Sequence, residues 1–539
     1  MKILQSPNIL NWYPFEKNQR VLEVANEIEK LTEMLRKKCN IVKSIKQLSE
    51  LDYIEEKFDI VTLIGINEYK KIDLENLVIR LEKVLNPDGK ILIAVDNKFG
   101  LRFWAGNPEK ILNQKFTSLI GYNNETLKTE TYTKKYIENI LKGIGYNTRF
   151  YYPLPDYKLP NVIFTDEQLP KYNSIDKYNP YFLEKSDILF NEIDVFREIL
   201  KTNKEMFTFF ANSFLVEITK GKCNEKYKYI SFNNMRKQEY QLITKISDTY
   251  VEKQEVDEKA IKHYENIKKN IEYLQEKGIR TVDYIEGEKI KSRYIEQKYL
   301  LNNILTEKLE QGKNTEFEDI INSYIKEITI EPYKETEYEK TVFSKYKIEI
   351  KDKSIIESMN FVKNGMWDMT FKNCFLIDNQ FYFFDQEWNE PNLPVEYILY
   401  RAILYTISLR RFVSIEKLFD KYNLSKYITL FEQLDNKIQE EIRDDEVWKF
   451  YSQNHDFNID GTKQELNNLQ IRSEAQETEI NNLNERFKAQ QLENNNLKEN
   501  NKLLQEELNK SNTERERLQT AINNTFLNKV KRKIKKIVK

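Results

Sequence analysis

The sequence predicts an α/β chain in three successive parts: a parallel sheet with crossover helices, a small β-rich lobe leading into a larger helical one, and a long coiled-coil helix. Short β-branched runs alternate with helical stretches over residues 17–220, which indicates the first part. The pattern changes over residues 226–455, which indicates the second. Beyond residue 462 Gly and Pro are absent and a heptad repeat begins, which indicates the third.

Length, charge and cysteine usage limit the class of protein. A chain of 539 residues is too long for one core and predicts two or three globular units. Its net charge of -1 gives no general attraction to nucleic acid or membrane. The three cysteines (Cys39, Cys223 and Cys374) are odd in number and far apart, so we expect no disulfide framework and no thiolate metal site, as in a reducing cytoplasm. We expect no signal peptide and no transmembrane segment, since no apolar run is long enough.

The first part contains strands and one helix with clear patterns. The helix DLENLVIRLEKVL has apolar residues at helical spacing and is followed by the turn NPDG. We expect the helix at residues 73–85, the turn at 86–89, and strands at 20–24, 57–65, 89–97 and 209–219.

The runs RVLEV, KFDIVTLIGINEY and LNPDGKILIAVDN resemble the class I S-adenosylmethionine (SAM)-dependent methyltransferases. The similarity continues through KFGLRFWAG and YYPLPDYKLPNVIFTDE, and it implies a Rossmann-like methyltransferase domain over residues 1–220. In that family a glycine-rich turn follows the first strand and lets the cofactor approach the backbone. Here Glu23 is followed by VANEIEK, which has no glycine.

One β-α unit of that family is predicted to be missing. Residues 35–57 leave room for a single strand, near 40–46, so the strand that carries the ribose-binding acid and its neighbour cannot both be present. We therefore expect weak or no SAM binding and a domain that serves as a structural remnant or docking platform. An active methyltransferase is the alternative. If SAM is retained, the nearest positional matches are Glu23, Asn26 and Asp59.

The second part contains the segment WDMTFKNCFLIDNQFYFFDQEW, in which Asp368, Asn373 and Asp385 surround two short apolar runs. An ordinary hairpin with solvated ends would explain this pattern. However, the segment follows a β-rich lobe and resembles protein kinases and their sugar- and antibiotic-phosphorylating relatives. The resemblance implies ATP and Mg²⁺ as cofactors. Asp368 would orient or deprotonate the acceptor hydroxyl, and Asn373 and Asp385 would bind Mg²⁺.

The same resemblance implies a set of ATP-binding residues upstream. The strand YVEKQEV would carry the phosphate-binding Lys253, with Glu265 of the next helix as its partner and Glu258 or Glu272 as alternatives. The strand expected at 292–300 would meet adenine around Glu296 and Gln297. Arg236 lies in SFNNMRKQEY, where a phosphate contact and a plain surface arginine both remain open. We expect His263 to be a core residue, and a helix at residues 397–413.

Two heptad positions run through residues 462–525, which predicts an oligomeric coiled coil about 90 Å long. Dimer and trimer both remain open. The tail at residues 526–539 places Phe526, Val530, Ile534 and Ile537 on one face among seven basic residues. We expect it to bind an anionic membrane surface, with nucleic acid or a solubilising role as alternatives.

The order of these parts resembles bacterial enzymes that cap a growing surface polysaccharide, such as O-antigen, by phosphorylating and methylating its end. The resemblance implies a membrane-associated, oligomeric phosphotransferase on the cytoplasmic face of the cell membrane. Its acceptor would be a glycan or lipid-linked glycan, and glycosyltransferases would be further partners. The competing hypothesis is a non-catalytic scaffold of a glycan-assembly complex.

Overall fold

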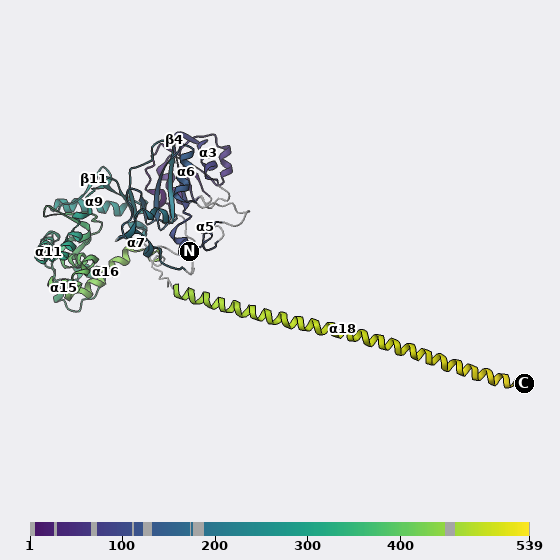
Figure 1. Ribbon diagram of the computed structural model, residues 1–539. Helices are drawn as coiled ribbons and strands as arrows, with labels where there is room; N and C mark the ends of the chain where they lie inside the picture. The colour runs from purple at the N-terminus through teal and green to yellow at the C-terminus, as the bar shows by residue number, and fades with distance from the viewer. Residues whose placement is uncertain are drawn as a thin grey trace. The chain divides into compact units, whose positions relative to one another are not determined.

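The computed structural model describes residues 6–25, 30–65, 73–109, 113–121, 132–172, 174–175, 188–447 and 459–537. These residues belong to two compact units, residues 1–457 and residues 458–539 (Figure 1). The first unit contains the large sheet and both predicted globular parts, and the second is a single helix.

A twelve-stranded sheet runs through the first unit. The seven strands that precede residue 220 and the five that follow it are joined where β6 pairs with β8, with Val162 opposite Ser231. The two parts predicted on either side of residue 220 therefore share one sheet. In spatial order the strands are β2 (Ile41–Ile45), β1 (Arg20–Val24), β3 (Phe58–Ile64), β4 (Leu85–Asp96), β7 (Ser213–Thr219), β5 (Asn147–Leu154), β6 (Val162–Thr165), β8 (Tyr229–Phe232), β9 (Leu242–Ile246), β10 (Tyr250–Glu255), β12 (Lys289–Arg293) and β11 (Asp283–Glu286).

The first half of the sheet is parallel from β2 to β4, and β7 is antiparallel to β4. The inner strand β4 is buried on both faces, because Ile91 and Ile93 pack in one core and Leu92 and Ala94 in another. The strands expected at 20–24, 57–65 and 89–97 are present. The strand expected at 209–219 begins only at Ser213, because the residues before it form a short helix.

Only one strand, β2, lies between α2 and β3, as the sequence predicts. It forms the edge of the sheet among the described residues. Lys46 and Gln47 follow it in place of an acid. The next acid in the sequence, Glu50, accepts hydrogen bonds from the backbone N–H groups of Lys46 (3.0 Å) and Gln47 (2.8 Å). This carboxylate is therefore occupied in holding a turn.

Helices cover the first half of the sheet, and the helix predicted at 73–85 is α3. The helices are α1 (Asn8–Asn11), α2 (Lys30–Lys38), α3 (Leu74–Glu82), α4 (Leu101–Trp104), α5 (Thr117–Ile120), α6 (Lys134–Gly143), α7 (Glu192–Thr202) and α8 (Met206–Phe210).

The second half of the sheet is antiparallel, and a helical lobe with its own core follows it (Figure 1). The structure corrects the bounds of one predicted strand and one predicted helix. The strand expected at 292–300 ends at Arg293 and gives way to a 3₁₀ turn at Gln297–Tyr299, and the helix expected at 397–413 ends at Leu404 and is followed by a 3₁₀ turn at Ile407–Arg411. The helices are α9 (Ile261–Glu276), α10 (Leu301–Glu310), α11 (Asn314–Ile328), α12 (Val342–Lys345), α13 (Ser354–Glu357), α14 (Val395–Leu404), α15 (Ile415–Lys421) and α16 (Ile428–Ile442). Two antiparallel strand pairs complete the lobe: β13 (Phe361–Gly365) with β16 (Glu390–Pro394), and the hairpin of β14 (Cys374–Ile377) with β15 (Gln380–Phe383).

The second unit is the helix α18 (Ile459–Ile537), which is 79 residues long and about 120 Å at 1.5 Å per residue (Figure 1). It includes the predicted coiled coil and most of the basic tail in one element. Leucines of the predicted heptad, among them Leu483, Leu497 and Leu504, are more than half exposed. Coiled-coil pairing stays a prediction. No helix among the residues described is long and apolar enough to cross a membrane.

Candidate active site

The hairpin β14–β15 brings together two of the predicted site residues. Asp378 and Asn379 form its turn with φ angles of 49° and 57°, the left-handed conformation that a tight two-residue turn requires. Asn373 precedes the first strand and Asp385 follows the second. The N–H of Phe384 donates to the carbonyl of Asn373 at 3.0 Å, so the two ends of the hairpin lie side by side.

The loop that carries Asp368 is tied to the same place. The carbonyl oxygen of Asp368 accepts hydrogen bonds from the side-chain amides of Asn373 (3.1 Å) and Gln386 (3.2 Å). One backbone oxygen therefore links Asp368 to Asn373 and to Gln386, the residue that follows Asp385. Gln386 is buried and was not predicted as a site residue.

Lys253 of β10 reaches this loop from the sheet. Its ammonium group contacts the carboxylates of Asp385 and Glu387, which lie more than 130 residues away in the chain. Lys253 is only 7% exposed. Burial lowers the pKa of Lys253, but the two carboxylates outweigh this effect and raise the pKa above its ordinary value. The lysine is therefore held in its charged form.

Glu387 is the buried anchor of the cluster, and no spacing rule identifies it from the sequence. Its carboxylate contacts Lys253 and Arg236, and its Oε2 lies 3.8 Å from Nε2 of His263. Burial raises the pKa of Glu387, but Arg236 and Lys253 hold it well below its usual range. Its position as an acid inside the quoted segment was the one available signal.

Glu265 is not the partner of Lys253, which corrects the prediction. It lies on the exposed face of α9 and binds Lys268 at 2.8 Å. His263 faces inward instead, because residues two apart lie on opposite sides of a helix. The alternatives are also excluded: Glu258 pairs with Lys37 at 3.0 Å, and Glu272 is exposed. Two acids on the loop after β15 occupy the place predicted for one acid on the helix.

Asp368 has an environment suited to exchanging a proton near neutral pH. Burial raises its pKa to about 7, an effect that Arg401 opposes and that the carboxylates of Glu387 and Asp385 reinforce. A carboxylate with a pKa near the working pH is an efficient general base.

Asn373 and Asp385 offer the oxygen donors that Mg²⁺ prefers. The Asn373 amide nitrogen is bonded to Asp368, which leaves its side-chain oxygen as an acceptor. The part of the chain that the structure describes contains no cluster of three or more His, Cys, Asp or Glu suited to a metal ion. Mg²⁺ commonly uses one or two protein ligands and completes its shell with water and substrate phosphates, so this pair fits it.

Of the remaining predicted ATP-binding residues, Arg236 belongs to the cluster around Lys253, whereas Glu296 and Gln297 have other partners. Arg236 is part-buried, binds Glu387, and lies 5.4 Å from the ring centre of Trp388, so it is not a free surface arginine. Glu296 is exposed and pairs with Lys298 at 3.0 Å. Gln297 accepts a hydrogen bond from Lys171, which belongs to the first half of the unit, at 3.1 Å. Both residues lie in the connection between β12 and α10.

The candidate SAM residues do not form a site. The Glu23 carboxylate is buried and accepts hydrogen bonds from Thr32 and from Ser44 (2.8 Å). Asp59 lies at the opposite end of the parallel strands, where it holds the backbone N–H of Arg20 and the amide of Asn86, both at 2.7 Å. Asp59 therefore cannot share a pocket with Glu23, which corrects its assignment. Asn26 lies outside the described residues.

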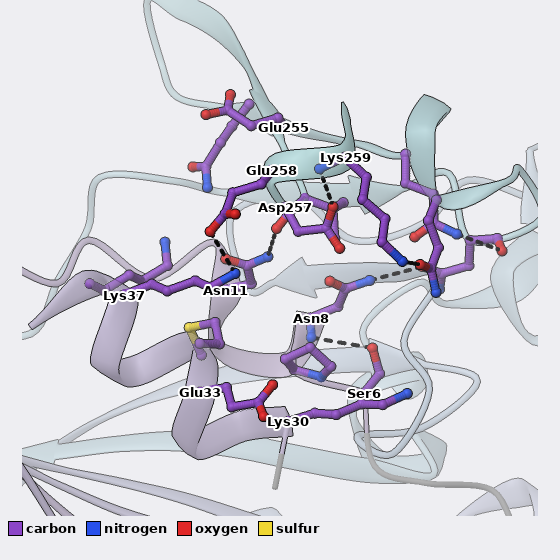
Figure 2. A pocket seen from close by; sticks show the side chains of 18 of the residues that line it. Ser6, Asn8, Asn11, Lys30, Glu33, Lys37, Glu255, Asp257, Glu258 and Lys259 are labelled. Atoms are coloured by element: carbon purple, nitrogen blue, oxygen red, sulfur yellow. Dashed lines mark hydrogen bonds and ion pairs between the residues drawn. The ribbon is translucent and has the colours of Figure 1, made fainter. Parts of the chain in front are cut away.

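A cavity of about 940 Å³ lies between α2 and the segment that follows β10 (Figure 2). Its lining mixes both charges, and the pair Lys37–Glu258 spans it. Of the predicted residues that the structure describes, only Glu258, an alternative partner for Lys253, lines it. The chemistry predicted from the sequence therefore lies elsewhere.

The chain is similar over part of its length to solved structures of SAM-dependent methyltransferases. A SAM-dependent methyltransferase from Archaeoglobus fulgidus is 13% identical, with 40% of this chain and 95% of that chain covered and a TM-score of 0.25. A possible histamine N-methyltransferase from Thermotoga maritima is 10% identical, with 40% and 86% covered and a TM-score of 0.21. At such scores nothing further follows from the likeness. No protein-family model and no curated protein matches the chain.

Proposed function

We propose that residues 226–455 transfer the γ-phosphoryl group of ATP to a hydroxyl acceptor with the help of Mg²⁺. The observation that carries the proposal is the contact between Lys253 of the sheet and Asp385, which follows β15. Hydrogen bonds from Asn373 and Gln386 to the carbonyl of Asp368 hold the loop before β14 beside it. Phosphoryl transfer needs a cation for the phosphates, metal ligands and an acceptor-facing carboxylate in one place. Each of these groups is present.

The residues of the site would bind the phosphates, hold the metal and accept the proton. Lys253 would bind the phosphates, with Glu387 as its fixed anchor. Asn373 and Asp385 would hold Mg²⁺, which when bound neutralises charge on the phosphates. Asp368 would take the proton of the acceptor hydroxyl as the new oxygen–phosphorus bond forms and the bond to the ADP oxygen breaks.

Thermal melting of the full chain with ATP and Mg²⁺ tests the proposal. Saturating ligand should raise the melting temperature by a few degrees, since binding at 100 times Kd stabilises a protein by about 2.7 kcal/mol. Asp385→Ala should abolish the rise, and the matched turn variant Asp378→Asn should keep it. No response in the wild-type chain would favour the scaffold hypothesis.

We also propose that the acceptor is the end of a surface glycan, free or lipid-linked. The support is the order of the parts, which resembles the polysaccharide-capping enzymes. Transfer of label from γ-labelled ATP to synthetic oligosaccharides, with and without a lipid diphosphate, tests this. Label on neither acceptor, with ATP binding intact, would reject the glycan while leaving the phosphotransferase.

The helix α18 is proposed to form an oligomer and to place its basic end on an anionic membrane on the cytoplasmic face. Exposed Phe526, Leu527 and Ile534 lie among lysines and arginines near the end of the helix, which supports this. Analytical ultracentrifugation should show a dimer or trimer. Cosedimentation should be stronger with anionic than with neutral vesicles and weaker at high salt.

SAM-dependent methyl transfer is the second candidate function. The strand order β2-β1-β3-β4-β7-β5 of the first half favours it, since it resembles the methyltransferase sheet with one edge strand missing. The closed environment of Glu23 and the absence of an acid directly after β2 argue for weak or no binding. Calorimetric titration of the full chain with SAM shows whether the first half binds the cofactor.

A further inference from the structure

A short segment before β11 fastens the end of the hairpin to the sheet. The N–H of Val282 donates to the carbonyl of Phe383 at 2.8 Å, and the N–H of Phe383 donates to the carbonyl of Arg280 at 2.9 Å. The next bond in the series is made by a side chain, because Oδ2 of Asp283 accepts the backbone N–H of Asp385 at 2.7 Å. The segment therefore ends on the backbone of the predicted metal-binding residue.

Asp283 is an unusual group to find at this position. Its side chain is 3% exposed, and its other oxygen accepts the hydroxyl of Ser292 on β12. Within the described residues it makes no salt bridge, and its two oxygens accept hydrogen bonds from Ser292 and from the backbone of Asp385. Lys253 is close enough to lower its pKa, but burial outweighs this and raises the pKa to about 6.

Asp385 needs a restraint of this kind. Its φ angle is +61°, in the left-handed region that residues other than glycine rarely adopt. Such a conformation persists only where the surroundings fix it. A carboxylate that accepts the N–H of that residue forms a charge-assisted hydrogen bond, which is stronger than a bond to a neutral acceptor.

We propose that Asp283 is a positioning residue that fixes the backbone of Asp385 and so aims its carboxylate at Lys253 and at the magnesium ion. The metal part of this role rests on the proposed phosphotransferase function, and the backbone part does not. Asp283 itself contacts neither Lys253 nor, in this role, the substrate. It acts through the N–H of Asp385.

Amide hydrogen exchange of the ligand-free full chain tests the backbone part. In Asp283→Ala the peptide covering residues 384–388 should exchange about 10-fold faster, since a hydrogen bond to a charged group is lost. Asp283→Asn keeps an acceptor and should exchange about three-fold faster. The hairpin peptide 374–383 serves as internal reference. Glu286→Gln, a change at an exposed carboxylate of the same strand, is the matched control and should exchange like the wild-type chain.

The Mg²⁺ concentration that half-saturates ATP binding tests the metal part. It should rise about 10-fold in Asp283→Ala, remain within about three-fold in Asp283→Asn, and be unchanged in Glu286→Gln. Wild-type exchange at residues 384–388 in either Asp283 variant would overturn the proposal. If the wild-type chain shows no Mg²⁺-dependent ATP binding, the proposed function fails, while the exchange result still decides the role of Asp283.

Discussion

The two halves of the first unit, which meet where β6 pairs with β8, use their acids in opposite ways. In the first half the buried Glu23 accepts two nearby hydroxyls at Oε2, and Asp59 binds the backbone of Arg20 at the far end of the strands. In the second half Asp385 and Glu387, on the segment after β15, both contact Lys253 of β10. The acids that match the methyltransferase family only by position therefore hold local structure. Asp385, which matches the predicted spacing, and Glu387, which does not, converge on one lysine.

Removal of Glu387 should lower the free energy of unfolding more than any other substitution. Glu387→Ala removes the carboxylate that the buried Lys253 shares with the part-buried Arg236, and it leaves Lys253 only its contact with Asp385. Breaking a buried ion pair by removing one partner costs about 3–5 kcal/mol. Urea denaturation should show a loss of this size.

Glu286→Gln is the matched control for this change. It breaks an exposed pair with Lys291 and should cost less than about 1 kcal/mol. Equal losses in the two variants would contradict a special role for Glu387.

Asp368→Asn should change how the stability of the protein depends on pH. Burial raises the folded-state pKa of Asp368 from its ordinary value near 3.8 to about 7. Between these values the folded chain binds more protons than the unfolded chain, so the free energy of unfolding falls as pH rises. Asparagine does not titrate, so the variant lacks this fall in stability. Its free energy of unfolding, relative to that of the wild-type chain, should therefore increase by about 1–2 kcal/mol from pH 5 to pH 8, measured by urea denaturation at each pH.

The exposed turn variant Asp378→Asn should show no such gain. A constant difference between Asp368→Asn and the wild-type chain at both pH values would mean that Asp368 titrates in the ordinary range.

The smallest expected effect is the heat of binding when SAM is added to the protein. Because the Glu23 carboxylate is buried and its Oε2 is bonded to Thr32 and Ser44, the first half exposes no acid of the predicted set to the ribose hydroxyls at the end of β1. Calorimetric titration of the full chain should give no binding in the micromolar range. Micromolar binding would show that residues outside the predicted set hold the cofactor, and the contrast between the two halves would disappear.

The strands of the first half could be predicted because a sheet buried on both faces needs continuous apolar runs, such as ILIAV in β4. The pairing of β6 with β8 could not, since antiparallel edge pairing leaves no mark in either strand's pattern. The start of β7 was misplaced for a related reason. The apolar run FFANSF suits a short helix and a strand equally well, and packing decides between them.

In the candidate site, the positions of Asp368, Asn373 and Asp385 were predictable because a tight hairpin fixes how far apart its ends can be. The partner of Lys253 was not. Helical spacing offers several acids on α9, but only tertiary packing shows that Glu265 faces solvent and that His263 and Glu387 fill the interior. Gln386 and Asp283 were missed because a single buried polar residue has no sequence pattern.

The most direct test of the central claim is calorimetric titration of the full chain with ATP, with and without Mg²⁺, in the wild-type protein and in Lys253→Met. The account predicts Mg²⁺-dependent binding that Lys253→Met weakens at least about 10-fold, since the phosphates lose their buried cation. No binding to the wild-type chain, or equal affinity in the variant, would contradict it.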